Sequence, residues 1–185
     1  MGNLKKAHYI TPIILLLLIC ATMQAQTLFN FKTKTNTNNW TVVNDVVMGG
    51  KSSANLNINR EGNGVFTGHV SLENNGGFSS LRHRFNTVST KLYSKIILKI
   101  KGDGKKYQFR IKSKSSHRYS YIHNFETSGE WQTIEILMHT MQPKFRGRKL
   151  NMPNYSNNTL EEIAFLIGNK KDEGFKLIID EILLK

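Results

Sequence analysis

One short glycine-rich segment contains residue types that bind phosphate groups. Gly49-Gly50-Lys51-Ser52 ends like a nucleotide-binding loop, in which backbone amides surround the phosphates. Such a loop needs a glycine five residues before Gly50, and that position holds Asp45. The sequence therefore argues against nucleotide binding at this segment.

Metal-binding and catalytic side chains occur without the spacing of a site. Beyond residue 25 the histidines are His69, His83, His117, His123 and His139. They lack the close spacing of metal ligands. Ser79, His83 and Asp103 could be combined into a triad, but Ser79 does not lie in the strand–turn–helix context of an activated serine. The 13 acidic residues fall mostly in turns and at strand ends and do not indicate a glycosidase pair. We expect no catalytic centre, no metal and no cofactor.

Lysine and arginine gather in two stretches of the chain. The first contains Lys105, Lys106, Arg110, Lys112, Lys114 and Arg118, interleaved with Tyr107, Tyr119 and Tyr121. The second contains Lys144, Arg146, Arg148 and Lys149. Interleaved aromatic rings and cations suit glycans through stacking and charge, although solvated strand faces would give the same pattern. The formal charge of +13 also favours an acidic partner, such as an anionic surface or an acidic polysaccharide.

Two glycine-containing loops each carry an aspartate. Asn44-Asp45 suits an Asx-type turn closed by its own hydrogen bonds, and Gly102-Asp103-Gly104 suits a tight turn. Three roles stay open for the two aspartates. Each could shape its turn, pair with an arginine such as Arg82 or Arg146, or contact a ligand. The segment 76–78 has the same ambiguity between a turn and a ligand contact.

The elements that position these residues are predicted to be β-strands. Apolar and polar residues alternate with a period of two, most clearly where Tyr107, Phe109 and Ile111 point one way. The predicted strands occupy residues 65–72, 94–101, 107–112, 119–125, 131–138, 163–167 and 175–184. About eight short strands separated by turn residues indicate an all-β, two-sheet β-sandwich or jelly roll.

Three details complete this expectation. Residues 26–39 are predicted to be a polar lead-in, from which Leu28, Phe29 and Phe31 dock on the core. Both tryptophans, Trp40 and Trp131, are expected in the core. Thr159-Leu160-Glu161-Glu162 matches a capping box and predicts one turn of helix.

The N-terminus has the features of a secretory signal peptide over residues 1–25. Lys5 and Lys6 precede the apolar run 13–19, and Ala25 ends a plausible cleavage zone. The run is too short to span a bilayer, so a retained anchor is less favoured. A lipidated Cys20 is also less favoured, because Ile19 is bulkier than the small residue normally found before such a cysteine. We therefore expect export through the Sec system to the periplasm or beyond, with 26–185 as a single domain. Export argues against nucleic acid as a partner, and no stable membrane span is expected.

Removal of the leader would also change charge and redox chemistry. Loss of Lys5 and Lys6 lowers the formal charge from +13 by two, to +11. Cys20 is the one cysteine and would leave with the leader, so the exported chain could form no disulfide.

Several stretches, read together, resemble the complex I intermediate-associated protein 30 family. They are residues 40–52, 66–82, 101–107 followed by Arg110, 145–148, and 163–168 with 174–177 and Ile182. They occur in order from Phe29 to Ile182 and so cover nearly all of the chain beyond the leader. The resemblance implies a galactose-binding-like jelly roll without catalytic activity.

The resemblance also implies a role. The best-known members of the family are chaperones in the assembly of respiratory complex I, which implies a protein-interaction module of the chaperone or assembly type. The secretory leader differs from an arginine-rich mitochondrial transit peptide and does not fit that particular complex. A carbohydrate-binding module is the alternative, and a hydrolase of acidic polysaccharide is a third possibility. The partner is thus a protein or a glycan.

The loops and motifs together nominate a set of binding residues. They are Asn44, Asp45, Met48, Gly49, Gly50, Gly76, Gly77, Phe78, Arg82, Gly102, Asp103, Gly104, Tyr107, Arg110, Phe145, Arg146 and Arg148.

Overall fold

The computed structural model describes residues 25–34 and 37–185, so the predicted leader lies outside it except for its last residue. The described helices are three short 3-10 turns, η1 (Asp45–Met48), η2 (Glu73–Asn75) and η3 (Met138–Thr140). None of the helices within these residues is long and apolar enough to cross a membrane. The strands are β1 (Gln26–Asn30), β2 (Trp40–Asn44), β3 (Ser53–Ile58), β4 (Gly64–Val70), β5 (Ser79–Ser89), β6 (Lys95–Lys101), β7 (Lys106–Lys112), β8 (Ser120–Glu126), β9 (Trp131–Leu137), β10 (Gln142–Phe145), β11 (Arg148–Lys149), β12 (Thr159–Ile167) and β13 (Glu173–Leu184).

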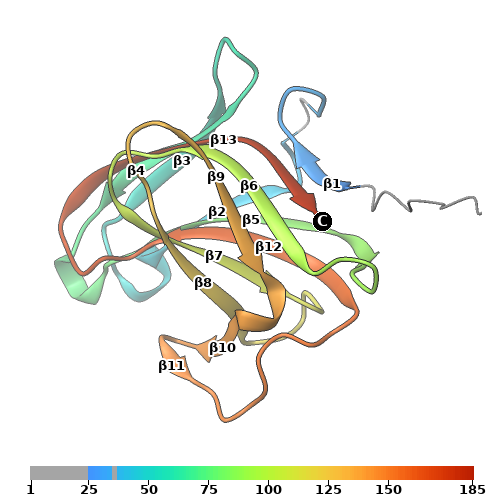
Figure 1. Cartoon of the computed structure of the whole chain (residues 1–185). Helices are drawn as coiled ribbons and strands as arrows, with labels where there is room; N and C mark the ends of the chain where they lie inside the picture. Colours follow the sequence, from blue (N-terminus) through green and yellow to red (C-terminus); the bar gives the residue numbers. More distant parts are fainter. Residues whose placement is uncertain (1–24, 35–36) are drawn as a thin grey trace, which may run out of the picture.

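These strands form two antiparallel sheets that pack face to face (Figure 1). The six-stranded sheet has the order β3-β4-β13-β6-β9, and β1 pairs with the C-terminal part of β13. The seven-stranded sheet has the order β11-β10-β8-β7-β12-β5-β2. The predicted all-β, two-sheet sandwich is confirmed.

Alternation along the strands fills the space between the sheets. On β7, Tyr107, Phe109 and Ile111 are buried in the core, as the period of two predicts. On β12, which lies beside β7, Ile163 and Phe165 face the same core. The intervening residues of both strands therefore lie on the outer face of the seven-stranded sheet.

The lead-in docks on the core as expected. Phe29 and Phe31 are buried, and Phe31 stacks on Trp40 with ring centroids 5.3 Å apart. The other tryptophan differs from expectation, because the Trp131 side chain is 42% exposed. Trp131 is the first residue of the edge strand β9 and lies on its outer side, because the alternate residues Ile134 and Ile136 face the core.

The predicted helical turn at 159–162 is wrong. Thr159 begins β12, which is hydrogen-bonded to β5 on one side and to β7 on the other. Glu162 does not reach back to cap Thr159, because its buried carboxylate pairs with Arg84 and Lys112. Pairing with β5 on one side, pairing with β7 from Glu162 onward and a double ion pair outweigh one turn of helix, which would gain a single cap.

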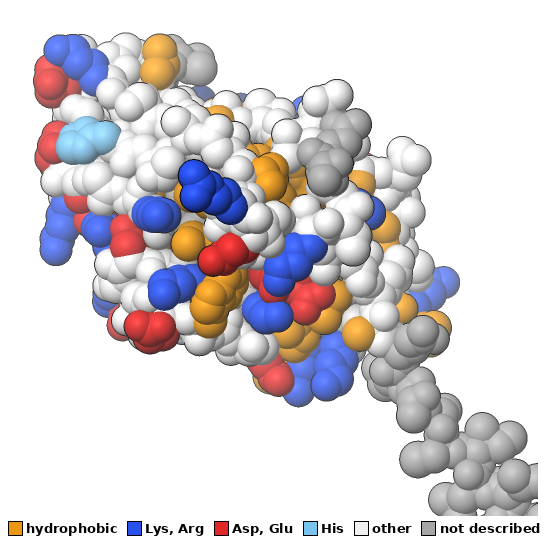
Figure 2. Space-filling model, turned by 90° about the horizontal axis from the view of Figure 1, so that it is seen from above, with side chains coloured by type: hydrophobic (Ala, Val, Ile, Leu, Met, Phe, Trp, Pro, Cys, Tyr) orange, Lys and Arg blue, Asp and Glu red, His pale blue; other side chains and the backbone are white. Residues whose placement is uncertain are grey.

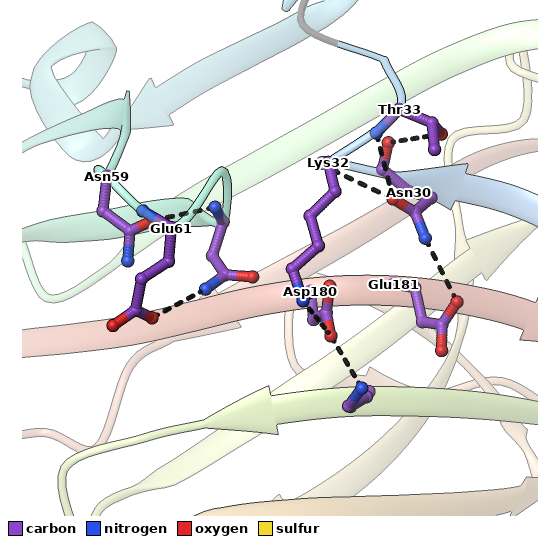
Figure 3. Close-up of polar contacts among 9 residues, drawn as sticks. Asn30, Lys32, Thr33, Asn59, Glu61, Asp180 and Glu181 are labelled. Carbon is purple, nitrogen blue, oxygen red and sulfur yellow. Dashed lines mark hydrogen bonds and ion pairs between the residues drawn. The ribbon is translucent and has the colours of Figure 1, made fainter.

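Charged side chains fasten the lead-in to the six-stranded sheet (Figure 3). Asp180 lies buried at a bulge in β13, with Lys32 Nζ 3.1 Å from Oδ1 and Lys99 Nζ 2.9 Å from Oδ2. Asn30 donates to Glu181 Oε2 at 3.2 Å. Burial alone would raise the pKa of Asp180, but the hydrogen bonds from Lys99 and Lys32 hold it below its ordinary value.

Candidate binding site

One carboxylate joins the loop after β2 to the loop before β5. Asp45 begins η1 and is buried. Ser52 donates its amide to Oδ1 at 3.1 Å and its hydroxyl to Oδ2 at 2.5 Å. The amides of Gly77 and Phe78 donate to Oδ2 at 2.6 and 3.2 Å. We call these four residues the Asp45 junction.

The two loops pack so closely around Asp45 that glycine is required. A Cβ on Gly50 would lie 2.3 Å from Asp45 Oδ1, and one on Gly76 would lie 2.7 Å from Oδ2. Burial alone would raise the pKa of Asp45. The hydrogen bonds from Ser52, Gly77 and Phe78 outweigh this effect and lower the pKa. The carboxylate is therefore ionised and fully engaged at neutral pH.

The expected Asx-type turn at Asn44-Asp45 is not formed. The Asn44 Oδ1 atom is buried and has no hydrogen-bond partner among the described residues, and Asp45 binds across the structure instead. Gly49 closes the turn with φ +85°, and its carbonyl accepts a bond from Asn74 at 3.0 Å. The Met48 side chain lies outside the described side chains. The loop is thus held by tertiary contacts.

Asp103 holds a second junction, between β6, β7 and β13. Its Oδ1 accepts from the Tyr107 hydroxyl at 2.8 Å, and its Oδ2 accepts from Lys105 Nζ at 2.8 Å and the Lys176 amide at 2.9 Å. Burial alone would raise the pKa of Asp103, but these three bonds lower it. Gly102 lies against Thr127, whereas Gly104, at φ +81°, lies in open space. This loop closes a strand connection.

Neither aspartate forms the arginine pair considered from the sequence. Asp45 is bound by amides and a hydroxyl, and Asp103 by Lys105, Tyr107 and an amide. The possible triad is also not assembled. Within residues 37–185, the buried Ser79 hydroxyl has no partner and His83 Nδ1 lies 3.2 Å from the Asn39 carbonyl. The carboxylates of Asp45 and Asp103 are therefore bonded within the fold.

Two motif arginines lie side by side on the outer face of the seven-stranded sheet. Arg82 on β5 and Arg110 on β7 both pair in register with Ala164 on the intervening β12. We call these three residues the Ala164 row. Arg82 and Arg110 form no ion pair with any described residue, and Arg110 donates Nε and Nη2 to Gln108 Oε1 at 3.0 and 2.6 Å. Burial, and next the charge of Arg82, lower the pKa of Arg110 to about 10.

Around this row, a floor of nearly buried apolar residues lies beneath polar side chains. Ala164, Leu166 and Ile122 point away from the core yet are 4–6% exposed, so longer neighbouring side chains surround them. Gln108 borders Leu166 in the register, and a hollow of about 70 Å³ beside Arg82 is also lined by Thr41, Val43 and Arg84. The Asp45 junction adjoins this face, since Phe78 and Leu166 both approach Gly168.

The opposite outer face carries charges that are paired. Seen from the side of β3, β13 and β1, blue and red side chains lie next to one another between apolar patches (Figure 2). Lys95 pairs with Glu135 at 2.8 Å, and Lys101 Nζ lies 3.6 Å from Glu130. The outer face of the seven-stranded sheet therefore carries unpaired guanidinium groups, whereas positive and negative side chains pair on the outer face of the six-stranded sheet.

The two predicted basic clusters are rearranged by folding. Lys105, Lys106 and Lys112 of the first cluster pair with acids. The second forms the β10–β11 hairpin, where Phe145 carries the guanidinium groups of Arg118 and Arg146 at 5.2 and 5.4 Å from its ring centroid. Arg148, also in the hairpin, is exposed. The hairpin is thus a separate basic projection, at the far edge of the sheet from Arg82.

Sequence reasoning missed three features of the molecule. Ala164 and Gln108 were not nominated for the site, although the alternation around Tyr107 already places Gln108 on the face away from the core. The third is a cavity of about 440 Å³ lined by Leu28, Phe29, Thr33, Lys34, Asn39, His83 and Phe85. Burial, as the main cause, lowers the pKa of His83 there. The described residues contain no group of three or more histidine, cysteine or acidic side chains that could hold a metal.

Comparison with known proteins agrees with this architecture. The family model described as Complex I intermediate-associated protein 30 (CIA30) matches residues 29–179. A relative from Drosophila melanogaster, described as "Complex I intermediate-associated protein 30, mitochondrial", is 24% identical over 187 aligned positions, covering 88% of this chain. The chain spans 63% of the length of that relative.

Similar solved structures include carbohydrate-binding modules. The family 11 module of the cellulosomal cellulase Lic26A-Cel5E of Clostridium thermocellum has a TM-score of 0.67 at 18% identity, over 87% of this chain and 94% of that one. A family 11 module from the same organism, in complex with a β-1,3-1,4-mixed-linked tetrasaccharide, has a TM-score of 0.66 at 18% identity, over 86% and 94%. The agarase AgWH50C has a TM-score of 0.58 at 13% identity, over 87% of this chain and 24% of that one. At these identities the likeness concerns the fold, a galactose-binding-like sandwich.

Proposed function

This chain belongs to the complex I intermediate-associated protein 30 family, and we propose that it is a non-catalytic domain that binds carbohydrate on the outer face of its seven-stranded sheet. The observation that carries the proposal is the apolar floor of Ala164, Leu166 and Ile122, bordered by the polar groups of Gln108 and Arg110. Sugar rings present an apolar face of C–H groups and an edge of hydroxyls. Sites for small ligands combine apolar side chains with a small number of placed polar groups that fix the orientation of the ligand.

The fold supports this choice over other ligands. Family 11 carbohydrate-binding modules share the sandwich over most of both chains, and one of them is in complex with a tetrasaccharide. The likeness alone does not locate a site on this chain. The Ala164 row and its floor supply the location.

The state of the acids supports a role without catalysis. A general acid must hold a proton near the working pH. The pKa values of Asp45 and Asp103 are lowered by several hydrogen bonds each, and Glu162 is held by Arg84 and Lys112. These carboxylates are committed to neighbouring groups and have little capacity to transfer protons.

A protein partner is the second candidate, and the edge of the six-stranded sheet favours it. On the edge strand β9, Trp131 is 42% and Leu137 is 40% exposed. Large exposed apolar side chains on an edge strand are features that a partner chain can cover. We also propose export of the chain, from the leader expected over residues 1–25.

A glycan array followed by calorimetric titration of the purified protein tests the proposal. We expect saturable binding to at least one oligosaccharide, with a loss of at least tenfold in affinity when Gln108 is replaced by alanine. Trp131→Ala is the matched control on the other sheet and should leave glycan affinity unchanged. Failure of the folded protein to bind any glycan at millimolar concentration, or loss of binding only in Trp131→Ala, would contradict the proposal.

A further inference from the structure

Two adjacent rows of the seven-stranded sheet have the same layout and differ in their middle residue. In one row, Glu162 on β12 pairs in register with Arg84 on β5 and Lys112 on β7. Its carboxylate receives Arg84 Nε at 2.8 Å and Lys112 Nζ at 3.2 Å. Two positions along each strand, the Ala164 row repeats the arrangement of cation, β12 residue and cation. Alanine there replaces the carboxylate.

The missing carboxylate leaves two like charges across one strand. Because neighbouring strands are about 4.8 Å apart, the backbones of Arg82 and Arg110 are separated by roughly 10 Å. Arg110 is partly buried, and this burial together with the neighbouring positive charge lowers its pKa. A charge in such a place is costly unless it is paired. Nothing within the described chain pairs it.

The Arg110 guanidinium is also held in an orientation that leaves one edge open to a ligand. Gln108 accepts two bonds from one edge of the Arg110 guanidinium and fixes its plane, so the Nη1 group remains for another acceptor. On the other side of Ala164, the hollow of about 70 Å³ adjoins Arg82. Two planar donor groups that flank a small residue fit the oxygens of one oxyanion, which guanidinium binds in a two-pronged manner.

We propose that the Ala164 row binds the oxyanion of an acidic sugar unit, a uronate carboxylate or a sulfate ester, in the position that Glu162 fills in the neighbouring row. The inference rests on the proposed function and names its substrate class. The acidic group would sit over Ala164 between Arg82 and Arg110. The rest of the sugar would extend toward Leu166 and Gln108.

Calorimetric titrations with matched ligands separate charge from ring recognition. The probes are an oligogalacturonate, its methyl ester, a sulfated galactan oligosaccharide and neutral galactan. At 0.1 M salt we expect the galacturonate or the sulfated ligand to bind at least tenfold more tightly than the methyl ester and neutral galactan. Which of the two binds better identifies the oxyanion.

Four variants locate the effect. Arg82→Gln and Arg110→Gln should each reduce the preference for the acidic ligand at least tenfold. Ala164→Glu should abolish it, because the new carboxylate would occupy the row as Glu162 does, and its melting temperature should not fall. Arg60→Gln removes an exposed arginine from the β3–β4 turn and should leave all affinities unchanged.

Each contrary result has a distinct meaning. Equal affinity for the acidic and neutral ligands overturns this inference and leaves the proposed function standing. An acidic preference that survives in both arginine variants but disappears in Arg146→Gln/Arg148→Gln also overturns it, because the hairpin would then be attracting polyanions. The absence of binding to every glycan removes both proposals together.

Discussion

The Asp45 junction and the Ala164 row differ in how their charged groups are compensated by neighbouring residues. At the junction, one buried carboxylate receives four hydrogen bonds and needs no cation. In the row, two arginines flank an alanine and find no acid among the described residues. Asp45, Arg82 and Arg110 all come from stretches that carry the family resemblance. Such residues thus divide into those whose bonding is complete within the fold and those whose charge is not paired by any described residue.

The largest effect should follow from removing the carboxylate of the junction. Asp45→Ala leaves buried amide and hydroxyl donors without an acceptor, which should reduce the free energy of unfolding by about 3 kcal/mol. Asp45→Asn should still cost about 2 kcal/mol, because its NH₂ group must face a donor whichever way it is turned. If Asp45 merely shaped a turn, Asp45→Asn would change the free energy of unfolding only slightly. Urea denaturation of both variants measures the difference.

Acid provides an independent check on the same carboxylate. The folded pKa of Asp45 is lowered from 3.8, so its contribution is fully present above that value and is lost as pH falls through the folded pKa. The gap in stability between the native protein and Asp45→Ala should therefore narrow below pH 3.8. A gap that stays constant down to pH 2 would show that the charge of Asp45 contributes nothing.

The next effect concerns space beside the same carboxylate. Gly50→Ala places a methyl group 2.3 Å from Asp45 Oδ1, and the four hydrogen bonds to the two carboxylate oxygens prevent the carboxylate from moving away. The strain should cost about 2 kcal/mol. Gly174→Ala is the matched control, since its Cβ would meet nothing closer than 3.8 Å. Equal shifts in the melting temperatures of Gly50→Ala and Gly174→Ala would show that the junction is not tightly packed.

A smaller effect is expected at the second aspartate. Asp103→Asn loses the ion pair with Lys105, which is partly exposed, but its NH₂ group can face Tyr107, whose hydroxyl can accept as well as donate. We expect a loss of about 1 kcal/mol, less than for Asp45→Asn. Chemical denaturation of the two asparagine variants side by side decides the order. The reverse order would mean that Asp103 carries more of the fold than Asp45.

The smallest effect should be in the Ala164 row. Arg82→Gln removes a charge that has no partner and relieves the repulsion on Arg110, so stability should change by less than about 0.5 kcal/mol. Arg84→Gln, two residues along the same strand, should be more destabilising because it breaks the pair with Glu162. Differential scanning calorimetry compares them. A loss above 1 kcal/mol in Arg82→Gln would place Arg82 among the structural residues.

Strands with apolar alternation could be predicted from the sequence, whereas polar ones could not. The run containing Phe109 needs no further information, because one face is uniformly apolar. β3, with the sequence Ser-Ala-Asn-Leu-Asn-Ile, also alternates, but serine and asparagine are typical of turns and occupy its whole outer face, so it is not among the predicted strands. The prediction for the segment beginning at Thr159 was wrong for another reason. Its helix signal is local in the sequence, whereas its pairing partners β5 and β7 are distant from it in the chain.

The two arginines of the proposed site could be nominated from the sequence, but their arrangement on one face could not. The family resemblance nominated Arg82 and Arg110 separately, together with aspartates that prove to be structural. That the two arginines share a face depends on the register of three strands far apart in the chain. Ala164 has no chemical signature at all. Its meaning arises only from the neighbouring Glu162 row.

The pairing of β1 with the end of β13 has a mechanical consequence. Gln26 lies opposite Leu184, and the two strands run antiparallel from that point. Tension applied between these two positions therefore loads the end of the ladder, where hydrogen bonds break one after another instead of sharing the force. β1 would peel away and draw Phe29 out of the core while the seven-stranded sheet stays intact. Under tension, the molecule would open first at the β1–β13 pairing, which belongs to the six-stranded sheet, whereas the Ala164 row lies on the seven-stranded sheet.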